Sequence, residues 1–73
     1  MTVASLIKKA RTRKGLNSYS EFAEFMGVSK ALVHAWEHGG QPSPRYLKII
    51  AERLGLDLKV LFRVQMSERL DKV

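Results

Sequence analysis

Two short helical patterns joined by three residues constrain the fold of this 73-residue chain more than any other feature. Apolar residues recur at helical spacing over residues 19–26 and again over residues 30–38. Gly27 suits the left-handed backbone conformation that ends many helices, Val28 can fill the angle between the two helices, and Ser29 can cap the second one. The sequence therefore predicts two helices that meet at a tight turn and bury their facing sides.

The helix predicted over residues 19–26 has a capping signal at its N-terminus. Ser18 and Glu21 have the spacing of a capping box, in which the Ser hydroxyl accepts from the Glu amide and the Glu side chain returns to the Ser amide. Ala23 is small enough for a close crossing of the two helices. Phe25 lies off the main apolar stripe, so it is either an exposed aromatic residue or a subunit contact. The positions expected to face the core are Tyr19, Phe22, Ala23, Met26, Val33 and Trp36.

Three further helices are predicted around this pair. One covers residues 6–14 and stops before Gly15, and another has Pro44 in its first turn and stops before Gly55. A short fifth helix follows Asp57, whose carboxylate can cap it. The chain is therefore expected to be an all-α, compact five-helix bundle.

The last part of the chain, residues 63–73, gives mixed signals. The apolar residues that alternate here are Val60, Phe62, Val64 and Met66. This alternation fits a strand, with an irregular arm as the alternative, and either would expose apolar surface to a partner. We therefore expect residues 1–62 to form the domain and residues 63–73 to form a C-terminal tail, a candidate dimerisation arm.

An excess of basic residues points to a polyanionic partner. Thirteen Lys and Arg against seven Asp and Glu give a formal net charge of +6, which favours nucleic acid through neutralisation of phosphates. Charge by itself also fits a ribosomal protein or a membrane-surface binder. The spacing of motif residues is therefore needed to choose among these classes of protein. Several of the basic residues lie in the first predicted helix. They form either a solvated helix face or part of a positive electrostatic field that attracts nucleic acid. They are Lys8, Lys9, Arg13 and Lys14.

Several classes of function are not expected. Without cysteine the chain has no disulfide or thiolate metal site, and the pair His34 and His38 lacks a third ligand, so no metal or cofactor is expected. Ser20 and Ser29 are explained better by helix capping than by catalysis, so we expect no enzyme and no small-molecule substrate. Neither a membrane span nor a secretory signal is evident, which predicts a cytoplasmic protein.

With its tight turn at residues 27–29, the pattern over residues 6–62 resembles the Cro/phage-repressor (Xre-type) family of helix-turn-helix DNA-binding domains. The motif residues that carry the resemblance are Phe22, Ala23, Gly27, Val28, Ser29, Val33, Trp36 and Glu37. It implies a lambda-repressor-like fold in which Arg11 and Glu37 form a buried or half-buried ion pair that orients the second helix of the motif. Trp36 is then a core residue and not a base-stacking one.

The resemblance also implies which residues contact DNA bases. The helix that starts after Ser29 would read the major groove. Lys30 can donate to guanine, and His34 can reach a base or a phosphate. Ala31 and Ala35 can touch thymine methyl groups, while sequence-dependent DNA shape can add to specificity.

Contacts with the DNA backbone are expected on either side of that helix. Arg45, in a segment that resembles the family's fourth-helix start, is the strongest candidate for a phosphate contact. Ser18 and Tyr19 lie where the family contacts phosphate, although Tyr19 replaces the usual Gln. Gly40 and Gln41 follow the reading helix, and the glycine either ends that helix or lets a backbone amide approach a phosphate.

Together these expectations describe a sequence-specific transcriptional regulator, a Cro-like or phage/plasmid-type repressor that binds double-stranded DNA as a homodimer on a two-fold operator. The alternative is a helical protein-interaction module, such as an antitoxin or adaptor, because Ala31, Leu32 and Ala35 offer few hydrogen bonds to bases. A generic RNA-binding protein is disfavoured, since no exposed aromatic platform is evident.

Overall fold

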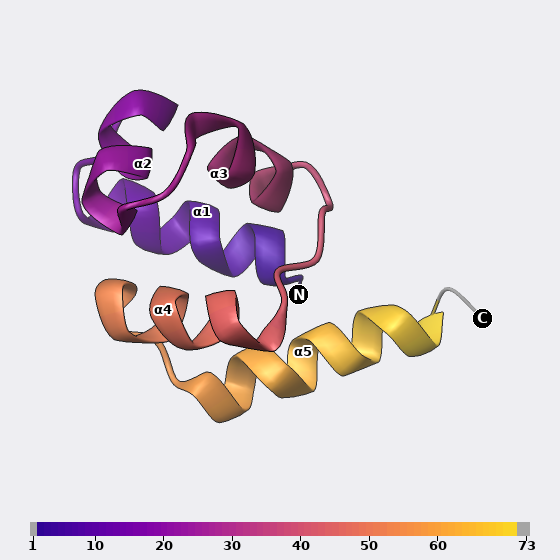
Figure 1. The fold of residues 1–73 in the computed structure, drawn as a ribbon. Coiled ribbons are helices and arrows are strands. Elements are labelled where there is room, and N and C mark those ends of the chain that lie inside the picture. The colour runs from indigo at the N-terminus through magenta and orange to yellow at the C-terminus, as the bar shows by residue number, and fades with distance from the viewer. Residues whose placement is uncertain (1, 72–73) are drawn as a thin grey trace.

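The computed structural model describes residues 2–71, which form five helices and no strand (Figure 1). The helices are α1 (Val3–Arg13), α2 (Tyr19–Met26), α3 (Lys30–Glu37), α4 (Pro44–Leu54) and α5 (Leu58–Asp71). The expected all-α, five-helix fold is therefore confirmed. None of the helices in this range is long and apolar enough to cross a membrane.

α1 begins earlier than the apolar spacing indicated. Thr2 and Ser5 cap its N-terminus reciprocally: the Ser5 N–H donates to Thr2 Oγ1 at 3.0 Å, and the Thr2 N–H donates to Ser5 Oγ at 3.1 Å. The added turn brings Val3 into the core. The helix ends at Arg13, before Gly15, as expected.

The turn between α2 and α3 follows the local signals in the sequence. Ser18 Oγ accepts from the Glu21 N–H at 3.1 Å. Gly27 ends α2 with a φ of 72°, in the left-handed region, and Ser29 Oγ accepts from the Leu32 N–H at 3.2 Å. Only half of the expected capping box forms, because residues 2–71 contain no return bond from the Glu21 side chain to the Ser18 amide.

A glycine is required where α3 leads into α4. The Gly40 N–H donates to the Ala35 carbonyl at 2.8 Å, and a Cβ on Gly40 would lie 2.8 Å from the same oxygen. The chain then passes the buried Pro42 and enters α4, which starts with Pro44 and ends before Gly55, as expected.

α5 differs from the sequence-based expectation. Asp57 Oδ1 accepts from the Lys59 N–H at 2.9 Å, as a cap should, but the helix is not short and continues to Asp71. The prediction of a strand or an irregular arm is therefore wrong for residues 63–71. Residues 72–73 of the predicted tail lie outside the described residues.

The physical reason is that α5 has apolar residues on two sides. Leu61 is buried in the core and Val64 is partly buried, whereas Val60, Phe62 and Met66 are exposed. Apolar residues divided between two sides of a helix alternate along the sequence and imitate the period of a strand. The C-terminal half of α5 extends past the other helices in Figure 1.

All five helices contribute to one core. α1 lies against α3, α4 and α5, and α2 lies against α3 and α4. The buried apolar residues are Val3, Ile7, Ala10, Phe22, Ala23, Met26, Val33, Trp36, Leu47, Ile50, Ala51, Leu54 and Leu61. This core covers one side of α3 and leaves its other side at the surface.

Candidate nucleic-acid interface

α3 has one buried side and one exposed side. Val33 and Trp36 are 0% and 2% exposed, and the Trp36 ring lies 5.6 Å from the Tyr46 ring, centroid to centroid. Trp36 is therefore a core residue, as predicted. The four residues expected to read bases are all exposed; they are Lys30, Ala31, His34 and Ala35.

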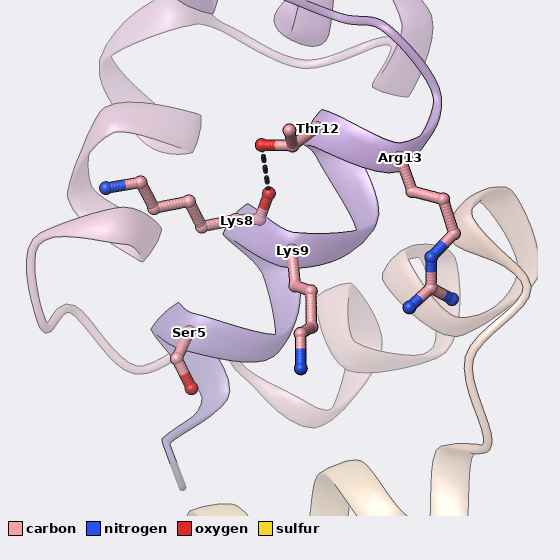
Figure 2. A pocket seen from close by; sticks show the side chains of 5 residues that line it. All are labelled: Ser5, Lys8, Lys9, Thr12 and Arg13. Carbon is pink, nitrogen blue, oxygen red and sulfur yellow. Dashed lines mark hydrogen bonds between the residues drawn. The ribbon is translucent and has the colours of Figure 1, made fainter.

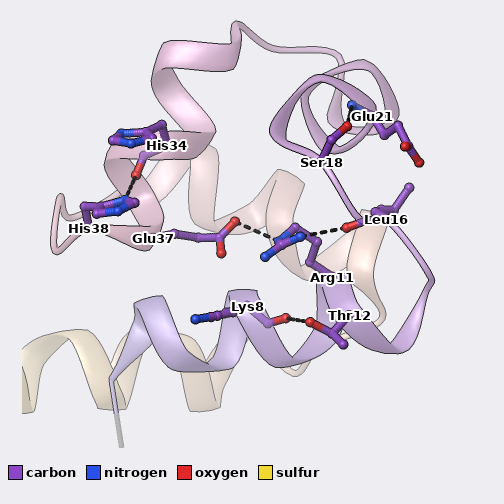
Figure 3. Close-up of polar contacts among 9 residues, drawn as sticks. All are labelled: Lys8, Arg11, Thr12, Leu16, Ser18, Glu21, His34, Glu37 and His38. Atoms are coloured by element: carbon purple, nitrogen blue, oxygen red, sulfur yellow. Dashed lines mark hydrogen bonds and ion pairs between the residues drawn. The ribbon is translucent and has the colours of Figure 1, made fainter.

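A buried ion pair fixes α3 against α1. Arg11 Nε lies 2.9 Å from Glu37 Oε2, with 13% of the Arg11 side chain and 2% of the Glu37 side chain exposed (Figure 3). Arg11 Nη1 also donates to the Leu16 carbonyl at 2.7 Å. The expected pair is confirmed, and it sets the orientation of α3 at its last residue.

Tyr19 lies where α1, α2 and α3 meet. The Arg11 guanidinium carbon is 5.7 Å from the centre of the Tyr19 ring, and the His34 ring packs edge-on against it at 5.1 Å. His34 and His38 stack at 4.0 Å, and His38 Nδ1 lies 2.8 Å from the His34 carbonyl oxygen. These contacts hold the exposed imidazole of His34 in place on the outer side of α3.

A polar pocket joins the starts of α2 and α3. Its lining residues are Arg11, Asn17, Ser18, Tyr19, Ser20 and Lys30. Among the described residues, the N–H groups of Tyr19 and Ser20 have no acceptor, because they belong to the first turn of α2. Backbone N–H groups at a helix start and hydroxyls are groups that bind phosphate oxygens. The pocket thus brings Ser18 and Tyr19, two predicted phosphate contacts, together with Lys30.

The other three predicted phosphate contacts follow the C-terminal end of α3. Arg45 is exposed in the first turn of α4 and has no hydrogen bond or ion pair within residues 2–71. The Gly40 N–H is already donated to Ala35, so this amide is not available to a phosphate. Gln41 is half-buried, and its Oε1 accepts from Arg69 Nε at 3.0 Å. Of the three, Arg45 is the side chain placed to reach an anion.

The exposed face of α1 carries further positive charge. Lys8, Lys9 and Arg13 are exposed around a shallow hollow that Ser5 and Thr12 also line (Figure 2). Lys14 is placed differently, with its Nζ 5.7 Å from the centre of the Phe25 ring. Phe25 is partly buried against the core, so the structure assigns it to packing within the chain.

Sequence reasoning missed some of the residues at this surface. Asn17 and Ser20 line the pocket at the start of α2, and only their position beside Ser18 could have indicated it. The contact between Gln41 and Arg69 joins residues that are far apart in sequence, so no local pattern could have shown it. In the described residues no group of three His, Cys, Asp or Glu side chains is placed to hold a metal ion.

Two short helices around a three-residue turn, with the second helix fixed by a buried pair and exposed on its outer side, define a helix-turn-helix DNA-binding protein. A family model described as helix-turn-helix matches residues 7–61. The chain therefore belongs to the Cro/C1-type helix-turn-helix family. Comparisons with curated proteins and with solved structures gave no match.

Proposed function

We propose that this chain is a sequence-specific transcriptional regulator, a Cro-like or phage/plasmid-type repressor, that places α3 in the major groove of its operator. The observation that carries the proposal is the division of α3 into two sides. Val33, Trp36 and the Arg11–Glu37 pair fix one side, while the four candidate reading residues cover the other. A rigid helix with a free outer side is what reading base edges requires.

Only a few side chains of α3 would contact base edges. Lys30 can donate to guanine, and His34 presents an imidazole that Tyr19 and His38 keep in position. Ala31 and Ala35 allow α3 to approach thymine methyl groups closely. Because these contacts are few, DNA shape has to contribute to specificity.

Phosphate contacts would flank the reading helix at both ends. The pocket at the starts of α2 and α3 supports one contact, and Arg45 after the C-terminal end of α3 supports another. Two anchors on either side of α3 would fix its register in the groove. The net charge of +6 favours association with DNA through counterion release.

The proposed regulator acts as a homodimer. One module of this kind buries only about 600 to 1,000 Å² on DNA, so two linked modules on half-sites about 34 Å apart bind far better. An exposed apolar stripe supports α5 as the contact between the two copies. It is formed by Phe62, Met66 and Leu70 and is called the α5 outer face below. Val64 of the predicted arm packs against the core of its own chain and is not part of this face.

We further propose that the chain is a binding protein and not an enzyme. It would act in the cytoplasm, on the nucleoid. The Ser29 hydroxyl supports a role without catalysis, because it accepts from the Leu32 amide as a helix cap and donates to no general base within residues 2–71. Selection of bound sites from a random duplex pool, at about 100 mM salt, tests the proposal because nonspecific binding is weakened there. A two-fold motif with half-sites about 10 base pairs apart is the expected result. Absence of any enriched motif would argue against it.

Two variants distinguish the proposed contacts with bases from the proposed contacts with phosphates. Arg45→Ala should weaken binding to all sequences and lower the slope of log affinity against log salt by about one unit. Lys30→Ala should instead relax preference at particular base pairs. Equal losses across every sequence for both variants would contradict this division.

A protein-interaction module remains the second candidate, favoured by two observations. The outer side of α3 carries two alanines, and the α5 outer face offers apolar surface for a partner. Such a module would bind duplex DNA at low salt no better than a variant with the same composition and rearranged surface charges. The random-pool selection separates the two candidates, because only the regulator enriches a motif.

A further inference from the structure

The C-terminal half of α5 lies outside the family match over residues 7–61 but is attached to the loop that follows α3. Gln65 is 4% exposed, which is rare for this residue type, and its Nε2 donates to the Pro42 carbonyl at 3.0 Å. This hydrogen bond is buried, and the Pro42 side chain is buried as well. The loop is thus anchored to α5 at Pro42.

A second contact reaches the preceding residue of the loop. Arg69 Nε donates to Gln41 Oε1 at 3.0 Å. Gln65 and Arg69 are four residues apart and therefore lie on one side of α5, one turn above the other. Two consecutive loop residues are held by two consecutive turns of the same helix.

Backbone hydrogen bonds do not support the loop at these two positions within residues 2–71. Gly40 is bonded to the end of α3, and Ser43 accepts from the first turn of α4, but neither Gln41 nor Pro42 has a backbone partner within residues 2–71. The contacts from α5, together with the buried Pro42 side chain, therefore hold the chain between the reading helix and Arg45. Arg45 follows the loop in the first turn of α4.

We propose that Arg69 and Gln65 are positioning residues for DNA binding, which hold the α3–α4 loop so that Arg45 and the end of α3 meet the DNA backbone in register. The inference rests on the proposed function. Gln41 is then a link between α5 and the loop, not a ligand of phosphate. A loop that is ordered before binding improves affinity, because no conformational entropy of the loop is then lost on association.

The Arg69–Gln41 contact offers the more direct test, because neither side chain belongs to the buried core and both can be replaced without opening a cavity in it. Arg63→Ala is the matched control. Arg63 is an exposed arginine of the same helix without a hydrogen bond or ion pair in residues 2–71, so its loss removes the same charge. The ligand is a duplex carrying the selected motif, titrated at several salt concentrations.

We expect Arg69→Ala and Gln41→Ala each to weaken DNA binding by about three- to tenfold relative to Arg63→Ala, the range for ordering one or two side chains on association. The double variant should be no weaker than either single one, because both remove the same link. Tm should stay within about 2 °C of that of the unmodified chain, since an exposed polar pair adds little stability. Amide exchange of Gly40, whose N–H donates to the Ala35 carbonyl just before the anchored loop residues, should quicken in Arg69→Ala and not in Arg63→Ala.

Three results would overturn the inference. Arg69→Ala and Arg63→Ala with equal affinities would show that Arg69 acts only through its charge. Additive losses in the double variant would make Arg69 a direct phosphate contact. Unchanged exchange at Gly40 would show that the loop does not depend on the link. Failure of the unmodified chain to bind any duplex is a different outcome, since it overturns the proposed function itself.

Discussion

At the scale of single residues, the Arg11–Glu37 pair is asymmetric. Arg11 also donates to the Leu16 carbonyl and lies over the Tyr19 ring. The Glu37 carboxylate is more deeply buried, and neither of its oxygens accepts a well-aligned hydrogen bond from residues 2–71. Removing Glu37 leaves a cation with other partners, whereas removing Arg11 leaves a buried anion with none.

This asymmetry predicts that Arg11→Met destabilises the fold more than Glu37→Gln does. Loss of one partner from a buried ion pair costs about 3 to 5 kcal/mol, and Arg11→Met should fall in that range while Glu37→Gln falls below it. Urea unfolding followed by circular dichroism measures both losses. The double variant Arg11→Met/Glu37→Leu should recover much of the stability. A larger loss for Glu37→Gln would contradict the prediction.

The two sides of α3 could be predicted from the sequence, but the surroundings of Tyr19 could not. Val33 and Trp36 fix the helical phase, so the exposure of Lys30 and His34 follows from helix geometry. The position of Tyr19 between Arg11 and His34 depends on how three helices pack. Tertiary packing of this kind is not contained in local spacing.

At the scale of helices, prediction succeeded where the signals are local. Ser18, Gly27 and Ser29 set the bounds of α2 and α3 through contacts within a few residues, so the sequence places these helices correctly. The sequence-based prediction for α5 is wrong beyond residue 62, because the contacts that hold this part of the helix come from residues far away in the sequence. Gln65 bonds to a residue 23 positions away and Glu68 to one 65 positions away.

The contact of Glu68 joins the two ends of the described chain. Its Oε1 accepts from the N–H of Val3, the first residue of α1. This N–H has no partner inside its own helix, and a carboxylate is favoured at the positive end of the helix dipole. α5 therefore stabilises the start of α1 in addition to closing the core.

We predict that Glu68→Ala lowers stability by about 1.5 kcal/mol, the lower value for a hydrogen bond to a charged group, because Glu68 is only partly buried. For a domain of this size the Tm should fall by about 6 to 12 °C. Glu52→Ala is the control, since it removes an exposed carboxylate from α4 that has no partner in the described residues. Thermal unfolding of both variants checks the prediction, and equal Tm values would show that the contact with Val3 adds nothing.

At the scale of the whole molecule, charge and apolar surface act in opposite directions on self-association. The net charge of +6 makes two copies repel each other, and DNA removes much of that repulsion. The α5 outer face favours association, but three side chains supply only part of the about 800 Å² that each partner buries in a stable complex. The proposed dimer should therefore form on the operator more readily than in free solution.

Met66, at the centre of the α5 outer face and 53% exposed, provides the test of this dimer. Met66→Asp puts a charge into the proposed contact, and it should weaken binding to a two-fold operator by about tenfold or more while leaving binding to a single half-site unchanged. Ser67→Asp adds the same charge at an exposed neighbouring position outside the face and should change neither. Replacing single residues avoids deletion of residues 63–73, which would also remove the buried Gln65 and the Glu68 contact. If Met66→Asp and Ser67→Asp bind the full operator alike, the copies meet through another surface.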